Sequence, residues 1–198
     1  KVKSVLDFED IDEINKLPDS DIIIGSPPCQ LFSLSNQGGN ANKDLGIHLI
    51  NTFFKVIAVK KFQKNSKLKA WLMENVPNSQ NYVQEEYTFE DLDLASWAVS
   101  QGLNPKSIAI KSKYNGGVLH ADDYGAAQAR RRFVSGEITK TGEFPFPDRV
   151  AKEKVTLNKL FRNFPDPLDQ SPVEFVTDPN YPNESVKFED FKDHFYDT

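Results

Sequence analysis

The stretch Asp21-Ile-Ile-Ile-Gly25, followed directly by Ser26-Pro-Pro-Cys-Gln30, decides the fold. Three isoleucines in a row favour a short buried strand, and the glycine and the two prolines end it in a loop. In α/β proteins, the loops that leave the ends of such strands carry the ligand-binding residues. The sequence therefore predicts a strand over residues 21–25 that delivers the chain's single cysteine, Cys29, to a functional edge of a sheet.

The neighbouring segments alternate between helix and strand patterns. Apolar residues recur with a helical period over residues 47–62 and 89–101. Three further stretches have the composition of short strands: Lys69–Glu74, Ser107–Lys111 and Arg132–Ile138. Strands separated by single helices predict an α/β fold with a mainly parallel sheet and helices on both of its faces.

Composition bounds the class of protein. The chain has 198 residues, 38% of them hydrophobic, and its 24 basic and 29 acidic side chains give a net charge of −5. This is enough for a folded core and excludes a disordered chain. One cysteine excludes an internal disulfide and a Cys-rich zinc site, and the three histidines lack metal-ligand spacing, so no metal is predicted. The sequence shows no signal-peptide pattern and no apolar stretch of membrane-spanning length, so we expect a cytoplasmic protein without a membrane partner.

Three polar clusters follow or flank the predicted strands. Cys29, on a loop stiffened by two prolines, is either a small core side chain or a nucleophile. Glu74, at the end of its strand, is either a proton-holding carboxylate or a helix cap or surface ion pair. The third cluster is Asp123–Arg132, in which alternation along an extended segment puts three side chains on one face, able to hold a planar, oxygen-rich ligand: Gln128, Arg130 and Arg132.

Two other stretches have a marked composition without a predicted site. Six lysines in the helix over 47–62 and its exit predict a solvated helix face rather than a DNA track: Lys55, Lys60, Lys61, Lys64, Lys67 and Lys69. Beyond residue 144, repeated prolines interrupt any periodicity and predict loops and turns. We therefore expect a boundary near residues 144–150.

In order and spacing, the three clusters resemble the DNA cytosine-5 methyltransferase family. Pro28-Cys-Gln30 comes first, Glu74-Asn-Val76 follows, and Gln128-Ala-Arg-Arg-Arg132 is last. Weaker matches extend the resemblance over residues 9–168: Glu9-Asp-Ile11, Tyr124-Gly125 and Phe164-Pro-Asp-Pro167. The resemblance implies a Rossmann-like S-adenosylmethionine-dependent methyltransferase core that acts on double-stranded DNA. The enzyme would be of the bacterial or phage type and would serve a restriction-modification or phage system.

The resemblance also implies catalytic roles. Cys29 would add to C6 of a flipped-out cytosine, so that C5 can accept the methyl group of S-adenosylmethionine. Glu74 would contact N3 and the exocyclic amino group of the base. Arg132 would hold O2 of the base near Cys29, and Arg130 would contact the neighbouring backbone.

Further contacts follow from the same resemblance. Gln30 and Ser33 would lie on a loop that closes over DNA, Asn75 would support Glu74, and Gln128 would join the substrate side of the site. The cofactor pocket would be lined by Asp10, Ile11, Pro28 and, less directly, Leu49.

The family's glycine-rich Phe-x-Gly-x-Gly cofactor loop is not found in these residues. We therefore expect a partial core, with residues 1–146 as the catalytic part and 147–198 as a connector and the start of the target-recognition region. A second chain or a further segment would supply the rest of the cofactor pocket.

Three alternatives stay open. A methyltransferase of the same family acting on tRNA is the first, and a non-catalytic subunit of a split methyltransferase is the second. The third is a thymidylate-synthase-like enzyme, which also presents Pro-Pro-Cys to a pyrimidine, although the Glu-Asn-Val and Gln-x-Arg-x-Arg motifs do not fit it.

Overall fold

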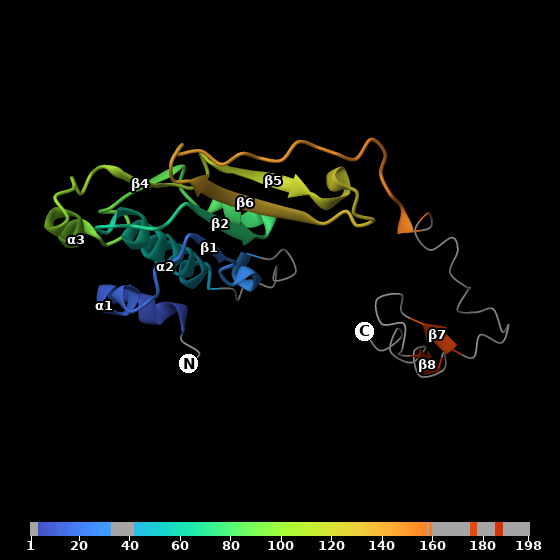
Figure 1. Ribbon diagram of the computed structural model, residues 1–198, viewed down its shortest axis with the longest axis horizontal. Coiled ribbons are helices and arrows are strands. Elements are labelled where there is room, and N and C mark those ends of the chain that lie inside the picture. The colour runs from blue at the N-terminus through green and yellow to red at the C-terminus, as the bar shows by residue number, and fades with distance from the viewer. Residues whose placement is uncertain (1–3, 33–41, 158, 160–174, 178–184, 188–198) are drawn as a thin grey trace. The chain divides into compact units, whose positions relative to one another are not determined.

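The computed structural model describes residues 4–32, 42–157, 159, 175–177 and 185–187. The chain forms two compact units, Lys1–Val155 and Thr156–Thr198 (Figure 1). In the second unit, the described strands β7 (Phe175–Thr177) and β8 (Ser185–Lys187) pair antiparallel. The division of function between residues 1–146 and 147–198 stays a prediction.

The main sheet of the first unit has the strand order β1-β2-β6-β5. Its strands are β1 (Ile22–Gly25), β2 (Ala70–Asn75), β5 (Gly116–His120) and β6 (Arg131–Ile138). β1 and β2 are parallel, whereas β6 runs antiparallel to both β2 and β5. The Rossmann-like class is confirmed, but this sheet is mixed, because β5 and β6 are joined by a connection too short for a crossover helix.

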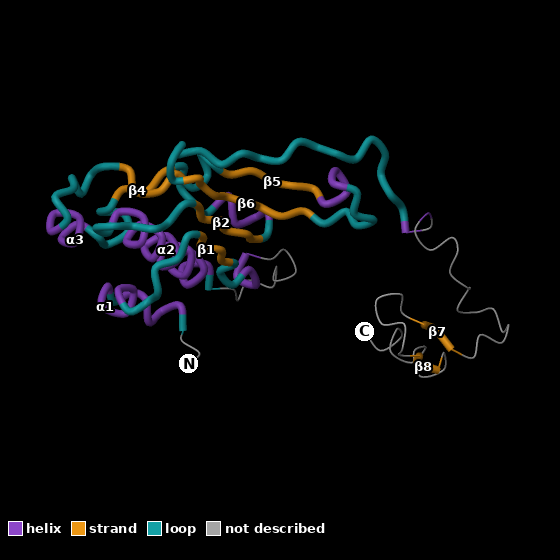
Figure 2. Tube along the Cα trace, viewed as in Figure 1, coloured by secondary structure: helices purple, strands orange, loops and turns teal. Residues whose placement is uncertain are grey.

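One long helix covers one face of the sheet. This helix, α2 (Lys43–Phe62), begins at Asn42, whose side-chain oxygen accepts a hydrogen bond from the Leu45 amide at 3.0 Å. Alternate β2 residues, Trp71 and Met73 among them, are buried toward α2, and the Phe54 ring packs edge-on against Trp71 at 5.7 Å. We call this side of the sheet the α2 face (Figure 2).

The remaining helices are short. η1 (Val5–Glu9) and α1 (Ile11–Asn15) precede β1, and α3 (Ala95–Ser100) follows β3. The helix predicted over 89–101 is therefore confirmed only in its second half. Asp93 adopts a positive φ of 53°, which breaks the helix before Leu94. Of the apolar residues that the helical period puts inside, Leu92 and Leu94 are buried, but Val99 is 62% exposed.

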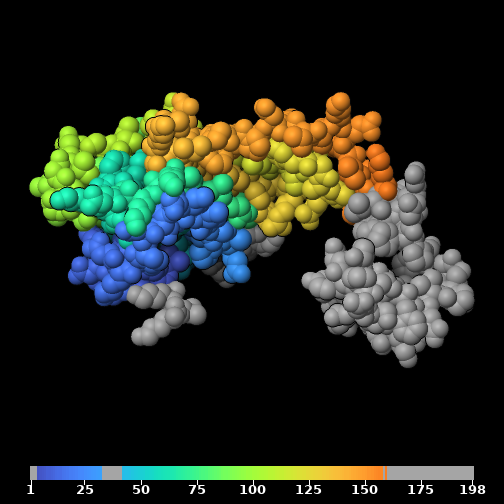
Figure 3. Space-filling model, viewed as in Figure 1, coloured from blue at the N-terminus to red at the C-terminus, as the bar shows by residue number. Residues whose placement is uncertain are grey.

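The opposite face of the sheet is covered only in part. Residues 143–155 form a strap over β5 and β6, drawn in orange in Figure 3. The nearest atom of its Phe144 ring lies 2.7 Å from the position that a Cβ on Gly136 would occupy. By contrast, Ile22 and Ile24 of β1 are 60% and 71% exposed. The sequence predicted a buried strand here and helices on both faces of the sheet. Among the described residues, neither prediction holds for the face of β1 that carries Ile22 and Ile24.

Several strands differ from the sequence prediction: β3 was not expected, and β7 and β8 form within the stretch predicted as loops and turns. β4 (Ile108–Lys111) forms where a strand was expected, but it pairs antiparallel with β3 (Glu86–Thr88) in a separate sheet. β5 was not predicted, because Gly116 and Gly117 give it no strand-like composition. The missing Cβ atoms make room for aromatic rings, Phe133 against Gly116 and Phe146 against Gly117.

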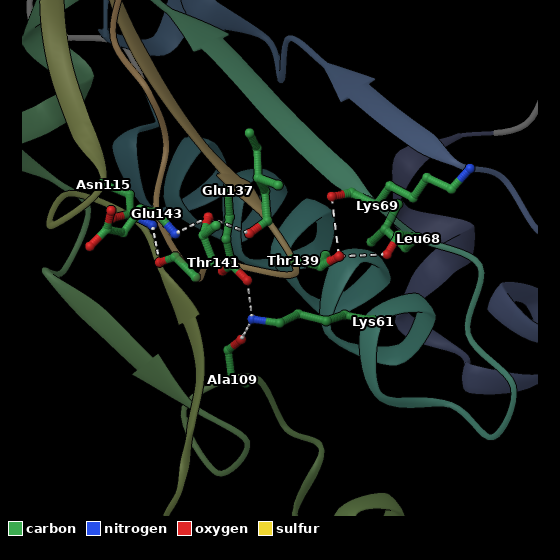
Figure 4. Close-up of polar contacts among 11 residues, drawn as sticks. Lys61, Leu68, Lys69, Ala109, Asn115, Glu137, Thr139, Thr141 and Glu143 are labelled. Atoms are coloured by element: carbon green, nitrogen blue, oxygen red, sulfur yellow. Dashed lines mark hydrogen bonds and ion pairs between the residues drawn. The ribbon is translucent and has the colours of Figure 1, made fainter.

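A buried ion pair closes the end of the β2–β6 ladder away from Glu74 (Figure 4). Lys61 Nζ of α2 lies 2.6 Å from Glu137 Oε1 of β6 and 3.3 Å from the Ala109 carbonyl oxygen. Lys61 is half-buried, whereas Lys60 is buried and donates to the Leu17 carbonyl at 2.8 Å. The prediction that the lysine group forms a solvated face is therefore wrong for these two residues, which tie α2 to the strands and loops around it.

Candidate active site

β1 and β2 bring the two candidate catalytic groups to the same edge of the sheet. The strands are parallel, with Gly25 opposite Met73, so Ser26–Cys29 and Glu74–Asn75 occupy neighbouring strand ends. Cys29 opens η2 (Cys29–Phe32), a single tight turn, and is half-buried there. The predicted placement of Cys29 just after a strand is confirmed, and of the two alternatives left open, a half-buried side chain in this turn is not one of the fully buried core residues.

Three hydrogen bonds join the two strand ends. Ser26 Oγ donates to Glu74 Oε2 at 2.7 Å, and Asn75 Nδ2 donates to the Pro27 carbonyl at 3.0 Å. Asn78, in the turn η4 (Pro77–Asn81), donates to the Phe32 carbonyl at 3.0 Å. The Cys29 segment is therefore held by the same stretch of chain that carries Glu74.

Glu74 is held on both of its carboxylate oxygens. Arg132 Nε lies 2.5 Å from Glu74 Oε1, while Ser26 occupies Oε2. The side chains of Glu74 and Arg132 are 34% and 26% exposed, so the pair opens to solvent on one side. Because each carboxylate oxygen can accept a second hydrogen bond, a ligand with N–H groups can bind here without displacing both donors.

Asn75 lies inside the protein and is fully buried. Its Nδ2 is bonded to the Pro27 carbonyl, and its Oδ1 accepts from the Val76 amide at 2.8 Å. This places Asn75 behind the Cys29 segment, where it supports the backbone.

The arginine segment differs from the expected extended run. η5 (Ala121–Tyr124) ends at Gly125 with a φ of 88°, and the chain then bends through Gln128 before β6 begins at Arg131. Alternation therefore does not place Gln128 on the Arg132 face. Arg130 does continue the ladder, since its carbonyl accepts from the Ala121 amide at 2.8 Å, and its side chain is exposed.

Two loop residues predicted to contact the substrate can be compared with the structure only in part. Gln30 is exposed within η2, next to Cys29. Ser33 lies outside the described residues. The roles of both stay predictions.

The four predicted cofactor residues come from three elements. Asp10 caps α1, its Oδ1 accepting from the Asp12 amide at 2.9 Å, and Ile11 is half-buried behind it. Pro28 is exposed at the end of β1, whereas Leu49 of α2 is 8% exposed. A carboxylate acceptor with apolar neighbours fits an adenine ring, although Leu49 offers it little surface.

Glu9 and His48, beside these residues, make a contact that the sequence did not indicate. His48 Nε2 of α2 lies 2.6 Å from Glu9 Oε1 of η1. A cavity of about 210 Å³ lies beside it, lined by Glu9, His48, Asn51, Thr52, Lys55 and residues 91–93. None of these residues belongs to the Cys29–Glu74 edge, whereas Glu9 and His48 are the chain neighbours of the predicted cofactor residues Asp10 and Leu49.

Two of the contacts at the site were missed by sequence reasoning, those of Ser26 and Asn78. Each joins residues more than forty positions apart in the chain. Serine and asparagine are common in turns, so nothing in the sequence marks these two.

In the described ranges, no group of three or more His, Cys, Asp or Glu side chains could hold a metal ion. The same ranges contain no helix of the length and apolarity needed to cross a bilayer.

Comparison with known proteins identifies the family. The model of the family "C-5 cytosine-specific DNA methylase" matches residues 2–178. The type II methyltransferase M.AquIA of Picosynechococcus sp. is 29% identical over 143 residues, which cover 71% of this chain and 53% of the relative. M.MthTI of Methanothermobacter thermautotrophicus is 31% identical over 157 residues, covering 77% and 41%.

A solved structure described as a putative DNA modification methyltransferase encoded within a prophage of E. coli shares 21% identity and a TM-score of 0.42, over 78% of this chain and 38% of that one. The chain thus spans about half, or less, of the length of the relatives it matches. Since the family model covers most of the sequence and its motif residues meet at one edge of the sheet, the chain belongs to the C-5 cytosine-specific DNA methylase family.

Proposed function

We propose that the protein transfers a methyl group from S-adenosylmethionine to C5 of cytosine in double-stranded DNA. The observation that carries the proposal is the shared edge at which Ser26, three residues before Cys29, bonds to Glu74 at 2.7 Å. This contact brings a nucleophile's loop and a carboxylate together, which is the arrangement that the chemistry at C5 requires.

Cys29 acts as the nucleophile. Its thiolate forms a bond to C6 of the base, and the displaced electron pair makes C5 reactive enough to take the methyl group. A base then removes the C5 proton, the Sγ–C6 bond breaks, and the thiolate leaves as 5-methylcytosine forms. Splitting one difficult substitution into an addition and an elimination is covalent catalysis.

Glu74 and Arg132 bind the edge of the same base. The carboxylate of Glu74 contacts N3 and the exocyclic amino group, and the guanidinium of Arg132 contacts O2. Arg130, exposed beside them, contacts the neighbouring backbone, with Gln30, Ser33 and Gln128 on the DNA side. Because a stacked base hides C6 from the thiol, the target cytosine is flipped out of the duplex.

S-adenosylmethionine supplies the electrophilic methyl group when it is bound. Asp10 and Ile11 would contact its adenine, and Pro28 and Leu49 would line its pocket. The Glu9–His48 contact at 2.6 Å, which joins η1 to α2, supports a shared pocket for Asp10 and Leu49, the chain neighbours of these two residues. The type II names of the relatives support a role in restriction-modification or phage self-protection.

A further polypeptide segment, in this chain or in a second one, completes the cofactor pocket. The exposed Ile22 and Ile24 support this, because they lie on an edge strand of a sheet whose parallel part should be covered on both faces. When this further segment is added to the 198-residue protein, it should cover Ile22 and Ile24 and so reduce the binding of a hydrophobic dye. Its addition should not change dye binding to an Ile22→Lys/Ile24→Lys variant. Equal responses of both proteins would count against this interface.

The proposed function is tested with the protein as its gene encodes it. Tritiated S-adenosylmethionine is supplied with duplex DNA or with tRNA, and label in 5-methylcytosine is counted. We expect label in duplex DNA, none with Cys29→Ser, and at most trace label with Glu74→Gln. Label in tRNA alone would favour the tRNA enzyme, and a wild-type protein without transfer to either substrate would favour the non-catalytic subunit.

A further inference from the structure

Asn78 holds the C-terminal end of the Cys29 turn. It lies in η4, directly after the Glu74-Asn75-Val76 strand end, and its Nδ2 donates to the Phe32 carbonyl at 3.0 Å. Asn81 Nδ2 in turn donates to Asn78 Oδ1 at 3.0 Å, which fixes the orientation of the Asn78 amide. The nitrogen of Asn78 is therefore committed to the turn that begins at Cys29.

A second side-chain amide, that of Asn75, hydrogen-bonds to the other end of the same segment. Asn75 Nδ2 donates to the Pro27 carbonyl at 3.0 Å, two residues before Cys29. Asn75 and Asn78, which we call the amide clamp, thus bracket the thiol from one stretch of chain. Since that stretch begins with Glu74, the clamp also fixes the placement of the thiol relative to the carboxylate.

Packing makes the Asn78 end of the clamp rigid. Phe32 is 1% exposed, and its ring lies 5.2 Å from that of Tyr82. The same ring packs against Gly46 of α2, where a Cβ would stand 2.6 Å from it. The side chain of Phe32 is thereby fixed, and the Asn78 bond fixes its carbonyl, so the two together determine where the turn ends.

We propose that Asn78 is a positioning residue for Cys29. It touches neither substrate nor cofactor. Its hydrogen bond keeps the turn closed and the thiol aimed at the same ring as Glu74. The anchoring part of this inference rests on the contacts alone, whereas its catalytic consequence rests on the proposed function.

Anchoring is tested through the thiol, since Cys29 is the chain's single cysteine and its alkylation reports on the turn alone. The variants are Asn78→Leu, which keeps size and neutrality but loses the donor, and Asn78→Ser, whose hydroxyl is too short to reach. Gln80→Leu, in the same η4, is the matched control. Iodoacetamide should modify both Asn78 variants about fivefold faster than wild type, and the control at the wild-type rate.

Low urea separates a loosened turn from lost stability. Alkylation through local opening is insensitive to urea, whereas alkylation through global unfolding accelerates with it. We expect the faster rates of the Asn78 variants to stay constant at low urea. Wild-type rates in both variants, or rates that rise with urea as global unfolding would make them, overturn the anchoring.

The catalytic consequence is measured in the protein as its gene encodes it. Misplacing the thiol should lower kcat about tenfold or more in both Asn78 variants, with the KM for DNA unchanged. An unchanged kcat, or a change in KM alone, overturns the positioning role. If wild-type protein transfers no methyl group, the proposed function fails, while the alkylation rates still decide whether Asn78 anchors the turn.

Discussion

Two glutamates sit at opposite ends of the β2–β6 ladder, and each is paired with a cation. Glu137 lies opposite Trp71 at one end, and Glu74 lies opposite Val134 at the other. Glu137 is 1% exposed and meets Lys61 at 2.6 Å, whereas Glu74 is 34% exposed and meets Arg132 at 2.5 Å. The two pairs have similar lengths and different surroundings.

The two carboxylates differ in their exposure to solvent and in their ability to accept hydrogen bonds from further partners. Among the described residues, the oxygens of Glu137 meet no partner other than Lys61, and α2 and β4 close over the pair. Glu74 points to the opposite face, opens to solvent and shares its second oxygen with Ser26. A buried carboxylate must stay paired for the protein to fold, but a partly open one can exchange partners.

The largest effect is expected at the buried pair. Lys61→Met leaves the Glu137 carboxylate buried without its cation, which should cost about 3–5 kcal/mol of the free energy of unfolding. Urea unfolding followed by tryptophan fluorescence measures it. Lys64→Met, at an exposed lysine just beyond the end of α2, is the control and should change little. A loss below about 1 kcal/mol for Lys61→Met would show that the Glu137 pair is not structural.

A double variant tests whether the cost is that of an unpaired charge. Lys61→Met with Glu137→Leu removes both charges and fills the space with apolar groups, so most of the lost stability should return, to within about 1–2 kcal/mol of wild type. Such a return would assign the loss to the orphaned carboxylate. A double variant as unstable as Lys61→Met would instead assign it to packing around α2.

The partly exposed Glu74–Arg132 pair should behave in the opposite way. Glu74→Gln should change the free energy of unfolding by less than ~1 kcal/mol, since a partly exposed pair contributes little. In the protein as its gene encodes it, the same change should slow methyl transfer about 10²–10⁴-fold. Glu90→Gln, at an exposed site, is the matched control. A large loss of stability with Glu74→Gln would remove the contrast between the two ends.

The smallest effect is expected at a third pair, on the strap. The hydrogen bond from Lys154 holds the pKa of Asp122 below its ordinary 3.8, against the desolvation that would raise it. The stabilisation from Asp122 is therefore complete above about pH 4 and is lost as pH falls through the lowered pKa.

Lys154→Met should consequently melt below wild type at pH 7, with the gap narrowing as pH falls below about 4 and through the lowered pKa of Asp122. The exposed Lys152→Met controls for the loss of a lysine charge in the strap. A melting gap that is constant across this range would mean that Lys154 acts through packing rather than through Asp122.

The sequence predicted the local elements better than their partners. β1, α2, β2 and β6 lie where composition and periodicity placed them, because those signals are local. The glycines that make β5 invisible in the sequence act through rings from elsewhere in the chain. Likewise, Lys60 and Lys61 look like any charged helix residues, and only the position of Leu17 and Glu137 in space shows that Lys60 is buried and that Lys61 is half-buried in an ion pair.

The candidate site follows the same rule. The motifs identified Cys29, Glu74 and Arg132, and the fold joins their segments. Ser26 and Asn78 were not predictable, because their partners are a carboxylate and a backbone carbonyl far along the chain. The extended run assumed for Gln128 to Arg132 is wrong, because the chain turns at the left-handed Gly125 and bends through Gln128 before β6 begins, and the role of Gln128 stays a prediction.

The most direct test of the central claim is a covalent trap at Cys29. Duplex DNA synthesised with 5-fluorocytosine in place of cytosine is incubated with S-adenosylmethionine and the protein as its gene encodes it, then denatured and digested. Because fluorine cannot leave C5 as a proton does, the thiol stays bound to C6. Mass spectrometry should find the nucleotide on the Cys29 peptide, and neither Cys29→Ser nor Glu74→Gln should trap it efficiently. An adduct on another residue, or no adduct at all, would contradict the account.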